Sequence, residues 1–232
     1  MKIVTNQKKI DRNLKLSKYT LYISLAMLAL GFIWSIRNTQ PENSLIGWLI
    51  LIPSYFLVQI SIYLSNKWGR SPRPDEIVTQ SLKGLKDEYT LYNFSTSIDH
   101  VLVGPSGIWI INPYHQRGEI TYNDKKGKYH QKGGPSFIGK YFGQEALPSV
   151  HRDVKNLKND LATFLQGKSI TTETEPAVVN LFIGEEVEIK GKDFPYLTLK
   201  SNKFKEYLRK HADKNILSAD QIEKINKKIT SK

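Results

Sequence analysis

Two long stretches without a charged side chain constrain most strongly what this chain can fold into. Residues 19–36, YTLYISLAMLALGFIWSI, run for 18 residues without a charge, and residues 45–64, LIGWLILIPSYFLVQISIYL, for 20. Because a helix needs roughly 20 apolar residues to cross the hydrocarbon core of a bilayer, both stretches are long enough to span it. The short segment 37–44 between them predicts a transmembrane helical hairpin. Aromatic residues, which favour the headgroup layer, lie near the ends: Tyr19, Trp34, Trp48, Tyr63 and Trp68.

Other interpretations of these stretches are weaker. A signal peptide would explain only the first, and the basic segment before it is long, no small-x-small cleavage site follows it, and a second apolar stretch comes soon after. Buried helices of a soluble core would show a polar face, which neither stretch has. The hairpin could itself be the functional part, as a subunit of an oligomer or complex. A transport pathway is disfavoured, because the stretches contain no charge and only Gln59 with scattered Ser and Tyr.

The positive charge of the chain is concentrated beside the hairpin. The formal net charge is +12; residues 1–20 carry six Lys or Arg and one acid, and residues 66–74 add three more basic residues. From Asp75 onward, 24 basic residues are accompanied by 20 acidic ones. This placement indicates attraction to a membrane surface first and to nucleic acid second. By the positive-inside rule, both termini are cytoplasmic, and we predict a multi-pass protein of the cytoplasmic membrane.

The chain therefore divides into four segments. Residues 1–18 are a basic cytoplasmic leader, residues 19–65 hold the two spans, residues 66–74 are a basic linker, and residues 75–232 form a soluble domain. There is no cysteine, which excludes disulfides and cysteine-based zinc sites. A soluble part of about 160 residues is large enough for a stable core.

The soluble part mixes helical and strand patterns. Four helices are predicted from the spacing of apolar residues, at 75–89, 148–166, 202–212 and 218–229. Ser218 is the predicted N-cap of the last one. Five apolar strands are predicted at 90–95, 98–104, 107–112, 177–184 and 194–200, with a polar hairpin at 117–133. We therefore predict an α/β or α+β fold for this part.

Several stretches of the soluble part resemble the nuclease-related domain, NERD: DEIVTQSL, YTLYNF, SIDHVLVGPSGIWII and RGEI, with weaker agreement in VVNLFIG and ILSADQIEKI. The most specific piece has an Asp-His pair before an apolar strand, a Gly-Pro-x-Gly turn and a second apolar strand. The resemblance runs from Asp75 to the last helix and leaves out the membrane part. Because this family is similar to the PD-(D/E)xK nuclease superfamily, it implies a restriction-endonuclease-like core, here preceded by the transmembrane hairpin.

The resemblance also implies which positions carry the family's chemistry. The glutamate of the family's first helix corresponds to Glu76, and its metal-binding aspartate to Asp99. Its next strand normally ends in Ile-Glu-x-Lys-Asn, with six residues from that Glu to a Gly. The spacing to Gly118 is kept here, but Asn112 stands at the Glu position and Tyr114 at the Lys position. The family's usual Gln on the helix after the hairpin has two candidates, Gln144 and His151.

These two replacements predict a loss of phosphodiester hydrolysis. The reaction needs Mg²⁺ held by carboxylates, a metal-bound water of lowered pKa, and a lysine that positions the water and adds positive charge. Asn112 offers only a neutral oxygen, and Tyr114 brings no positive charge. Since each such loss typically costs ~10²–10³ in rate, we predict a catalytically degenerate domain that requires no cofactor. Glu76, Asp99, Asn112 and Tyr114 are then vestigial positions.

An active nuclease with a rearranged site is the alternative. Glu119 is the candidate migrated acid, Glu76 could supply a second carboxylate, and Lys140 could replace the missing lysine. Such an enzyme would need Mg²⁺ or Mn²⁺ bound through Asp99. The competing interpretations are structural: Asp99 as a strand-end cap or a partner of a basic neighbour, and the others as solvated surface charges.

The remaining polar residues favour binding over catalysis. The loop QKGGPSFIGKYFG and the helix after it mix cations with aromatic rings, which suits phosphate contact and base stacking, although ordinary loop packing explains it as well. The candidate nucleic-acid-binding residues are Lys132, Lys140, Tyr141 and His151. The histidines stand on separate elements without a metal-ligand spacing, which argues against zinc. We therefore predict a membrane-anchored binding or scaffold module whose partner is nucleic acid or a protein.

Overall fold

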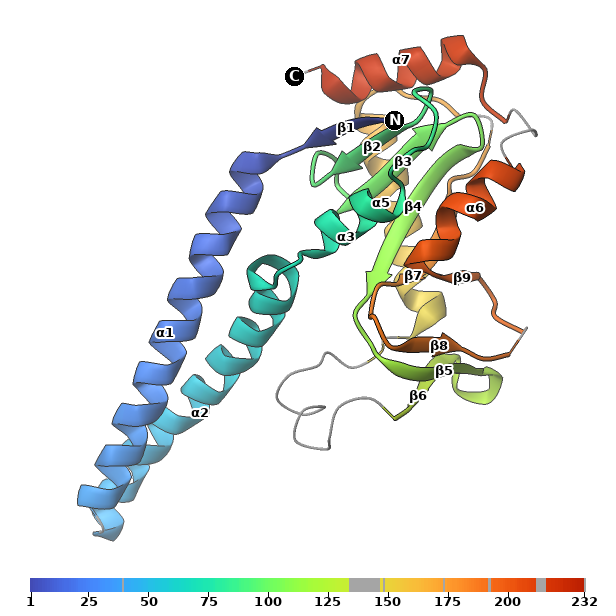
Figure 1. Ribbon diagram of the computed structural model, residues 1–232. Coiled ribbons are helices and arrows are strands. Elements are labelled where there is room, and N and C mark those ends of the chain that lie inside the picture. Colours follow the sequence, from blue (N-terminus) through green and yellow to red (C-terminus); the bar gives the residue numbers. More distant parts are fainter. Residues whose placement is uncertain are drawn as a thin grey trace. The chain divides into compact units, whose positions relative to one another are not determined.

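The computed structural model describes residues 1–38, 40–133, 147, 149–172, 174–191, 193–211 and 216–231, apart from the side chains of residues 41–44. These residues form two compact units (Figure 1). One unit is a helical hairpin of residues 7–73. The other is a mixed α/β unit, made of residues 1–6 together with the described residues from Pro74 onward.

The hairpin consists of α1 (Gln7–Arg37) and α2 (Pro41–Leu64), and α2 continues into a short π-helix, η1 (Ser65–Gly69). Both helices are long enough and apolar enough to cross a bilayer, on length and composition alone. The predicted spans 19–36 and 45–64 lie within them. Helix α1 begins twelve residues before the first predicted span, because the basic residues that precede Tyr19 are good helix formers.

The two helices pack through residues that recur every seven positions and are mostly small. Ser17 and Ser65 share a hydrogen bond, with their hydroxyl oxygens 3.2 Å apart, and a Cβ added to Gly31 would lie 2.9 Å from Leu51 Cδ2. Small side chains let the two backbones approach closely, and a seven-residue repeat favours a left-handed supercoil. Many of the large apolar side chains between Leu16 and Tyr63 are instead exposed. The buried repeat is Ile10, Ser17, Ser24 and Gly31 on α1, and Gly47, Ser54 and Ser61 on α2, followed by Trp68.

The α/β unit contains two sheets. The larger one has the strand order β1-β2-β3-β4-β7-β9 and the smaller one β6-β5-β8. The strands of the larger sheet are β1 (Lys2–Thr5), β2 (Thr90–Asn93), β3 (His100–Gly104), β4 (Gly107–Tyr114), β7 (Ala177–Phe182) and β9 (Leu197–Lys200). Those of the smaller sheet are β5 (Gly118–Asn123), β6 (Lys128–Lys132) and β8 (Val187–Ile189), with a 3₁₀ turn, η2 (Asp124–Lys126), between β5 and β6.

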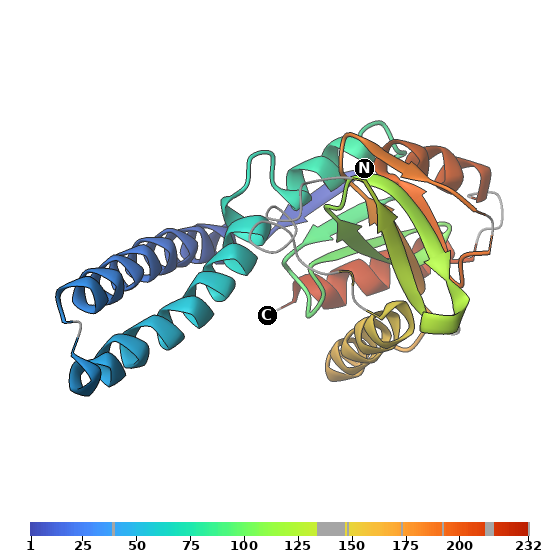
Figure 2. The ribbon, with the colours of Figure 1, turned by 90° about the horizontal axis from the view of Figure 1, so that it is seen from below.

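Helices cover both faces of the larger sheet, which is seen from another side in Figure 2. Because side chains alternate along a strand, Ile108 and Ile110 of β4 face one cluster, and Trp109 and Ile111 face the other. Helices α5 (Val150–Gly167) and α7 (Ala219–Thr230) pack on the first face. Helices α3 (Pro74–Ser81) and α6 (Ser201–His211) pack on the second. This mixed α/β arrangement confirms the predicted fold class.

The leader contains a strand that the sequence analysis missed. Strand β1 pairs in parallel with β2, with Lys2 opposite Thr90 and Thr5 opposite Asn93, and the Lys2 and Asn6 amides donate to the Tyr89 and Asn93 carbonyls at 2.8 and 3.0 Å. Four residues, KIVT, are too few to show a strand period beside a basic helix. Residues 1–18 are therefore split between the edge of the larger sheet and the start of α1.

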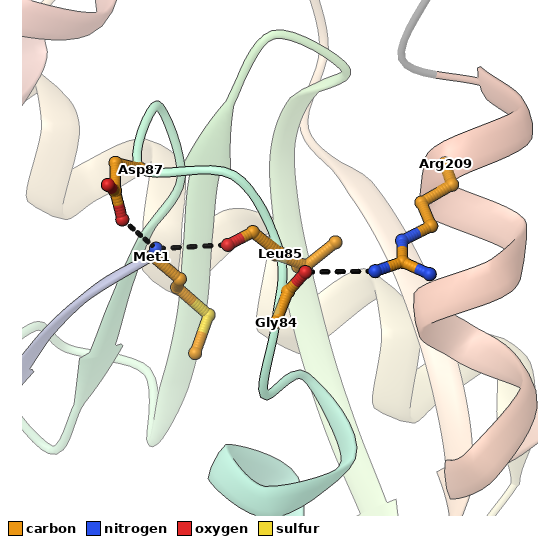
Figure 3. A network of polar contacts seen from close by, with 5 residues as sticks. All are labelled: Met1, Gly84, Leu85, Asp87 and Arg209. Carbon is orange, nitrogen blue, oxygen red and sulfur yellow. Dashed lines mark hydrogen bonds and ion pairs between the residues drawn. The ribbon is translucent and has the colours of Figure 1, made fainter.

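The segment between α3 and β2 is held from two directions (Figure 3). The Met1 amino group donates to the Leu85 carbonyl at 3.1 Å and pairs with Asp87 at 2.7 Å. On the other side, Arg209 of α6 donates to the Gly84 carbonyl at 2.9 Å. Gly84 has φ +86°, a left-handed conformation that ends the helix before the predicted residue 89.

The other predicted elements agree with the structure to within a few residues. The apolar strands and the polar hairpin are present, and Ser218 caps α7 in a capping box with Gln221. Strand β8, only three residues long, was not predicted.

Candidate functional site

Asn112 and Tyr114 lie side by side at the end of β4. They are two residues apart on one strand, so both point to the face that α5 covers. Strand β7 runs parallel to β4 and brings Asn180 opposite Asn112. The spacing that the sequence analysis singled out therefore has a physical meaning, because it places both side chains in one layer between the sheet and the first turn of α5.

Asp153, in that first turn, receives both side chains. Asn112 Nδ2 and the Tyr114 hydroxyl each donate to Asp153 Oδ2 at 2.8 Å. Asn112 Nδ2 also lies 3.0 Å from the Tyr114 hydroxyl and 3.2 Å from Asn180 Oδ1. These four residues are called the Asp153 cluster below. It contains one carboxylate, two amides and one phenol, and none of its own side chains is a cation.

Further hydrogen bonds extend the Asp153 cluster to neighbouring strands. The buried Asn180 donates to the Tyr129 hydroxyl of β6 at 2.8 Å, and that hydroxyl lies 2.7 Å from Thr198 Oγ1 on β9. Rings pack around these bonds, with Tyr114 stacked on Phe182 at 5.1 Å between centroids. The end of β4 is thus filled by side chains whose hydrogen-bonding groups are paired with one another.

Burial keeps the tyrosines of this layer neutral. It raises the pKa of Tyr114 far above its ordinary value, and the neighbouring Asp153 carboxylate raises it further. Burial likewise raises the pKa of Tyr129 to about 12. At neutral pH Tyr114 is therefore a hydrogen-bond donor without charge, as its residue type predicted.

Asp99 lies at the same end of the sheet. Strands β3 and β4 pair with Val101 opposite Ile110, and extending this register by two residues places Asp99 opposite Asn112. Asp99 is half-buried and ends a turn in which its carbonyl accepts a 2.7 Å bond from the Phe94 amide. Phe94 has φ 57°, an uncommon conformation for a bulky residue that the turn imposes.

The two other predicted acids stand elsewhere. Glu76 is exposed in the first turn of α3, a helix that packs on the opposite face of the larger sheet. Glu119 lies on β5 in an ion pair with Lys190 at 2.7 Å, and this hydrogen bond lowers its pKa. The structure thus gives Glu119 a partner in the smaller sheet, and its role as a migrated acid stays a prediction.

Two of the four predicted nucleic-acid-binding residues can be placed. Lys132 is exposed at the end of β6. His151 is exposed in the first turn of α5, where its ring nitrogens lie 3.0 Å from the Tyr122 hydroxyl and 3.2 Å from the Tyr196 hydroxyl. Lys140 and Tyr141 lie outside the described residues. Within the described residues there is no group of three or more His, Asp or Glu side chains placed to hold a metal.

Comparison with protein families identifies part of the chain. Residues 75–180 match the family described as NERD, nuclease-related domain. The chain carries a NERD domain. Searches among curated proteins and among solved structures find no match.

The NERD match covers α3 to the middle of β7 and so includes the whole Asp153 cluster. Elements β9, α6 and α7 continue the same unit after the matched part. The sequence analysis missed Asp153 and Asn180. Asp153 had one signal, as an acid two residues after His151 at the start of the helix behind the hairpin. Asn180 had another, as the polar residue inside the apolar strand AVVNLF.

Proposed function

We propose that this protein is a membrane-anchored NERD-domain protein that has lost nuclease chemistry and acts as a binding module. The supporting observation is the Asp153 cluster. Asn112 and Tyr114 occupy the positions where the family's acid and lysine are expected, and both donate to Asp153. They serve as neutral hydrogen-bond donors to an existing carboxylate.

The chemistry of the Asp153 cluster supports this proposal. Mg²⁺ prefers a nearly octahedral set of oxygens that includes carboxylates. Here the Asn112 amide nitrogen is directed at Asp153, and one carboxylate oxygen is occupied by two donors. A carboxylate that is already satisfied by buried neutral donors needs no metal to compensate it. Under this proposal the protein needs no cofactor.

The chain's topology supports the anchoring. Strand β1 lies immediately before α1, and α3 follows shortly after η1, while both β1 and α3 belong to the α/β unit. Both ends of the hairpin must therefore be on the same side of a membrane that it enters. The basic flanks support the proposal that this side is the cytoplasm, by the positive-inside rule.

The partner that we propose is nucleic acid, with a protein as the other candidate. The exposed Lys132 offers a cation, and the His151–Tyr122–Tyr196 group, whose histidine stands two residues before Asp153, offers aromatic rings. Phosphate pairing with base stacking is the usual recognition mode for such side chains. Fluorescence anisotropy of labelled single-stranded DNA and RNA would test this, with Lys132→Gln expected to weaken binding and Lys224→Gln as a distant control.

A cleavage assay tests the loss of catalysis. The full chain in detergent would be incubated with DNA and RNA in Mg²⁺ or Mn²⁺, beside Asp99→Ala. We expect no cleavage above background by either protein. Cleavage by the natural sequence that disappears in Asp99→Ala would overturn the proposal. It would favour a metal-dependent nuclease with a rearranged site, in which Asp153 would be a further acid at the same end of the sheet as Asp99.

Restoring the family residues needs a third change. In the double variant Asn112→Glu/Tyr114→Lys, the new carboxylate would lie beside Asp153, and the new ammonium would pair with it. Adding Asp153→Asn removes both effects. If the fold is a nuclease that lost its chemistry, Mg²⁺-dependent cleavage should appear in the triple variant and not in the natural chain.

A further inference from the structure

The first three turns of α1 carry a stripe of positive charge that the packing of the hairpin does not use. Lys8, Arg12 and Lys15 recur at i, i+4 and i+7 and therefore share one helix face. All three side chains are exposed, whereas Ile10 and Ser17, two residues further along from Lys8 and Lys15, are buried. At 3.6 residues per turn, a step of two residues reaches nearly the opposite face. The basic stripe, Lys8, Arg12 and Lys15, thus lies on the side of α1 opposite the buried repeat.

The same stripe continues into the apolar part of α1 as aromatic residues. Tyr19 and Tyr22 follow Lys15 at the next two helical steps and are 63% and 66% exposed. Tyrosine favours the headgroup layer of a bilayer, where its ring is apolar and its hydroxyl is hydrated. The basic stripe therefore begins one helical turn from side chains that suit the headgroup layer.

The end of the second helix adds positive charge at this same end of the hairpin. The Ser17–Ser65 hydrogen bond places η1 beside the first turns of α1, and η1 and the residue after it contribute Lys67 and Arg70. At the other end of the hairpin, Arg37 is followed within five residues by Glu42. The positive charge is thus gathered at one end.

In the described part of the chain, the basic stripe has no acidic partner that would balance its charge. Asp11 is the only acid before Glu42 in the sequence, and it accepts a 2.8 Å bond from Gln7. No salt bridge joins Lys8, Arg12 or Lys15 to an acid in the described part of the chain. Three exposed cations on one face without a counter-charge favour an external anion.

We propose that the basic stripe binds the headgroups of anionic phospholipids in the membrane that holds the hairpin; this inference rests on the proposed anchoring. An arginine guanidinium can pair with a phosphate through two hydrogen bonds, and lysines add point charge. Groups of four to eight basic residues beside a membrane span attract anionic lipids. Nucleic acid is the less favoured ligand, because the stripe runs without interruption into Tyr19 and the apolar span.

Lipid binding to the full chain tests this inference. The protein would be placed in nanodiscs of equal parts phosphatidylcholine and phosphatidylglycerol, and native mass spectrometry would count the lipids that stay bound. We expect phosphatidylglycerol to be enriched in the natural chain. In Lys8→Gln/Arg12→Gln/Lys15→Gln the enrichment should fall by about tenfold or more. The control Lys125→Gln/Lys224→Gln/Lys227→Gln makes the same charge change in exposed residues of the α/β unit and should keep it.

Three results would overturn the inference. The first is equal enrichment in both triple variants. The second is displacement of the lipid by millimolar inorganic phosphate, which would show a general phosphate site. The third is loss of DNA binding, without loss of lipid enrichment, in the stripe variant. Failure of the natural chain to enter nanodiscs would instead overturn the proposed anchoring, and this inference with it.

Discussion

At the scale of single residues, Asp153 organises the candidate site. Asn112 and Tyr114 both donate to one of its oxygens, and Asn180 and Tyr129 extend the hydrogen bonds to other strands. Hydrogen bonds to a charged group contribute more than neutral ones, and removing one donor leaves the carboxylate partly unsatisfied. Asn112 and Tyr114 are therefore expected to contribute to the stability of the fold.

Tyr114→Phe should destabilise the α/β unit by about 1.5–3 kcal/mol, since it removes a hydrogen bond to a partly buried carboxylate. For a unit of this size we expect a fall in melting temperature of roughly 3–10 °C, measured by circular dichroism of the full chain in detergent. Tyr207→Phe is the matched control, because its hydroxyl has no hydrogen-bond partner in the described part of the chain. Equal shifts for the two variants would contradict the role given to Asp153.

Alkaline pH should destabilise the domain through its buried tyrosines. Burial raises the pKa of Tyr92 and of Tyr129 to about 12, so each binds its proton more tightly in the folded than in the unfolded chain. Their contribution to stability is full below about pH 10, the unfolded value, and is lost as pH rises through 12. Absorbance at 295 nm should show late ionisation, which Tyr129→Phe should diminish. Ionisation of every tyrosine near pH 10 in the folded protein would contradict this.

The sequence could locate part of the candidate site. Asp99, Asn112 and Tyr114 can be found from local features, namely the Gly-Pro-x-Gly turn and the spacing to Gly118. The spacing of residues along a strand directly fixes the relative positions of their side chains. Asp153 could not be found in this way. The orientation of α5 on the sheet decides which of its residues contacts the end of β4. This orientation is a tertiary feature, and no local sequence pattern predicts it.

At the scale of elements, β1 is the most consequential. It occupies the edge of the larger sheet and covers the outer side of β2, whose backbone would otherwise be open to pairing with other chains. The Ser95 hydroxyl, in the turn that ends at Asp99, also donates to the Val4 carbonyl at 3.3 Å. A fragment that starts at Pro74 would lack this strand.

Val4→Pro should therefore destabilise the α/β unit more than Ile3→Pro. The Lys2 and Asn6 amides donate to β2, so by alternation the Val4 amide does so too, while the Ile3 amide faces outward. Proline removes the donor, and we expect Val4→Pro to lower the melting temperature by several degrees and Ile3→Pro by less. Equal effects would mean that β1 does not pair as described. A fragment of residues 74–232 should also aggregate more readily than one in which residues 1–6 are joined to it by a flexible linker.

The elements that could be predicted from the sequence are the long ones in which apolar residues recur with a clear period. Strands β3, β4 and β7 are continuous apolar runs, and α5 has a clear apolar stripe, so all were predicted. Strands β1 and β8 have four and three residues, too few to show alternation, and both are defined by the partner strand alone.

At the scale of the whole molecule, composition alone predicted a hairpin and a separate soluble domain. Both predictions use the average composition of long stretches, which does not depend on the position of any single residue. The seven-residue repeat of Ser and Gly between α1 and α2 was visible in the sequence but needed the structure to show that the two repeats face each other. The participation of residues 1–6 in the α/β unit was not predictable, since it joins segments that are 88 positions apart.

The topology can be tested with introduced cysteines, since the chain has none of its own. Asn38→Cys lies beyond the end of α1, at the turn of the hairpin, and Lys224→Cys lies on α7. In sealed right-side-out cells or vesicles, a membrane-impermeant maleimide should label position 38 and should label position 224 only after lysis. Labelling of both from the same side would contradict a two-span hairpin.

The pairing of β1 with β2 also bears on how the protein is made. Strand β1 leaves the ribosome first, and its partner follows only after both apolar helices have been synthesised. If the hairpin enters a membrane as proposed, a nascent chain that inserted a single helix would leave β1 across the bilayer from the rest of its sheet. Under the proposed anchoring, the sheet can be completed when both helices have crossed the bilayer but not when only one of them has, so pairing of β1 with β2 selects against a half-inserted hairpin.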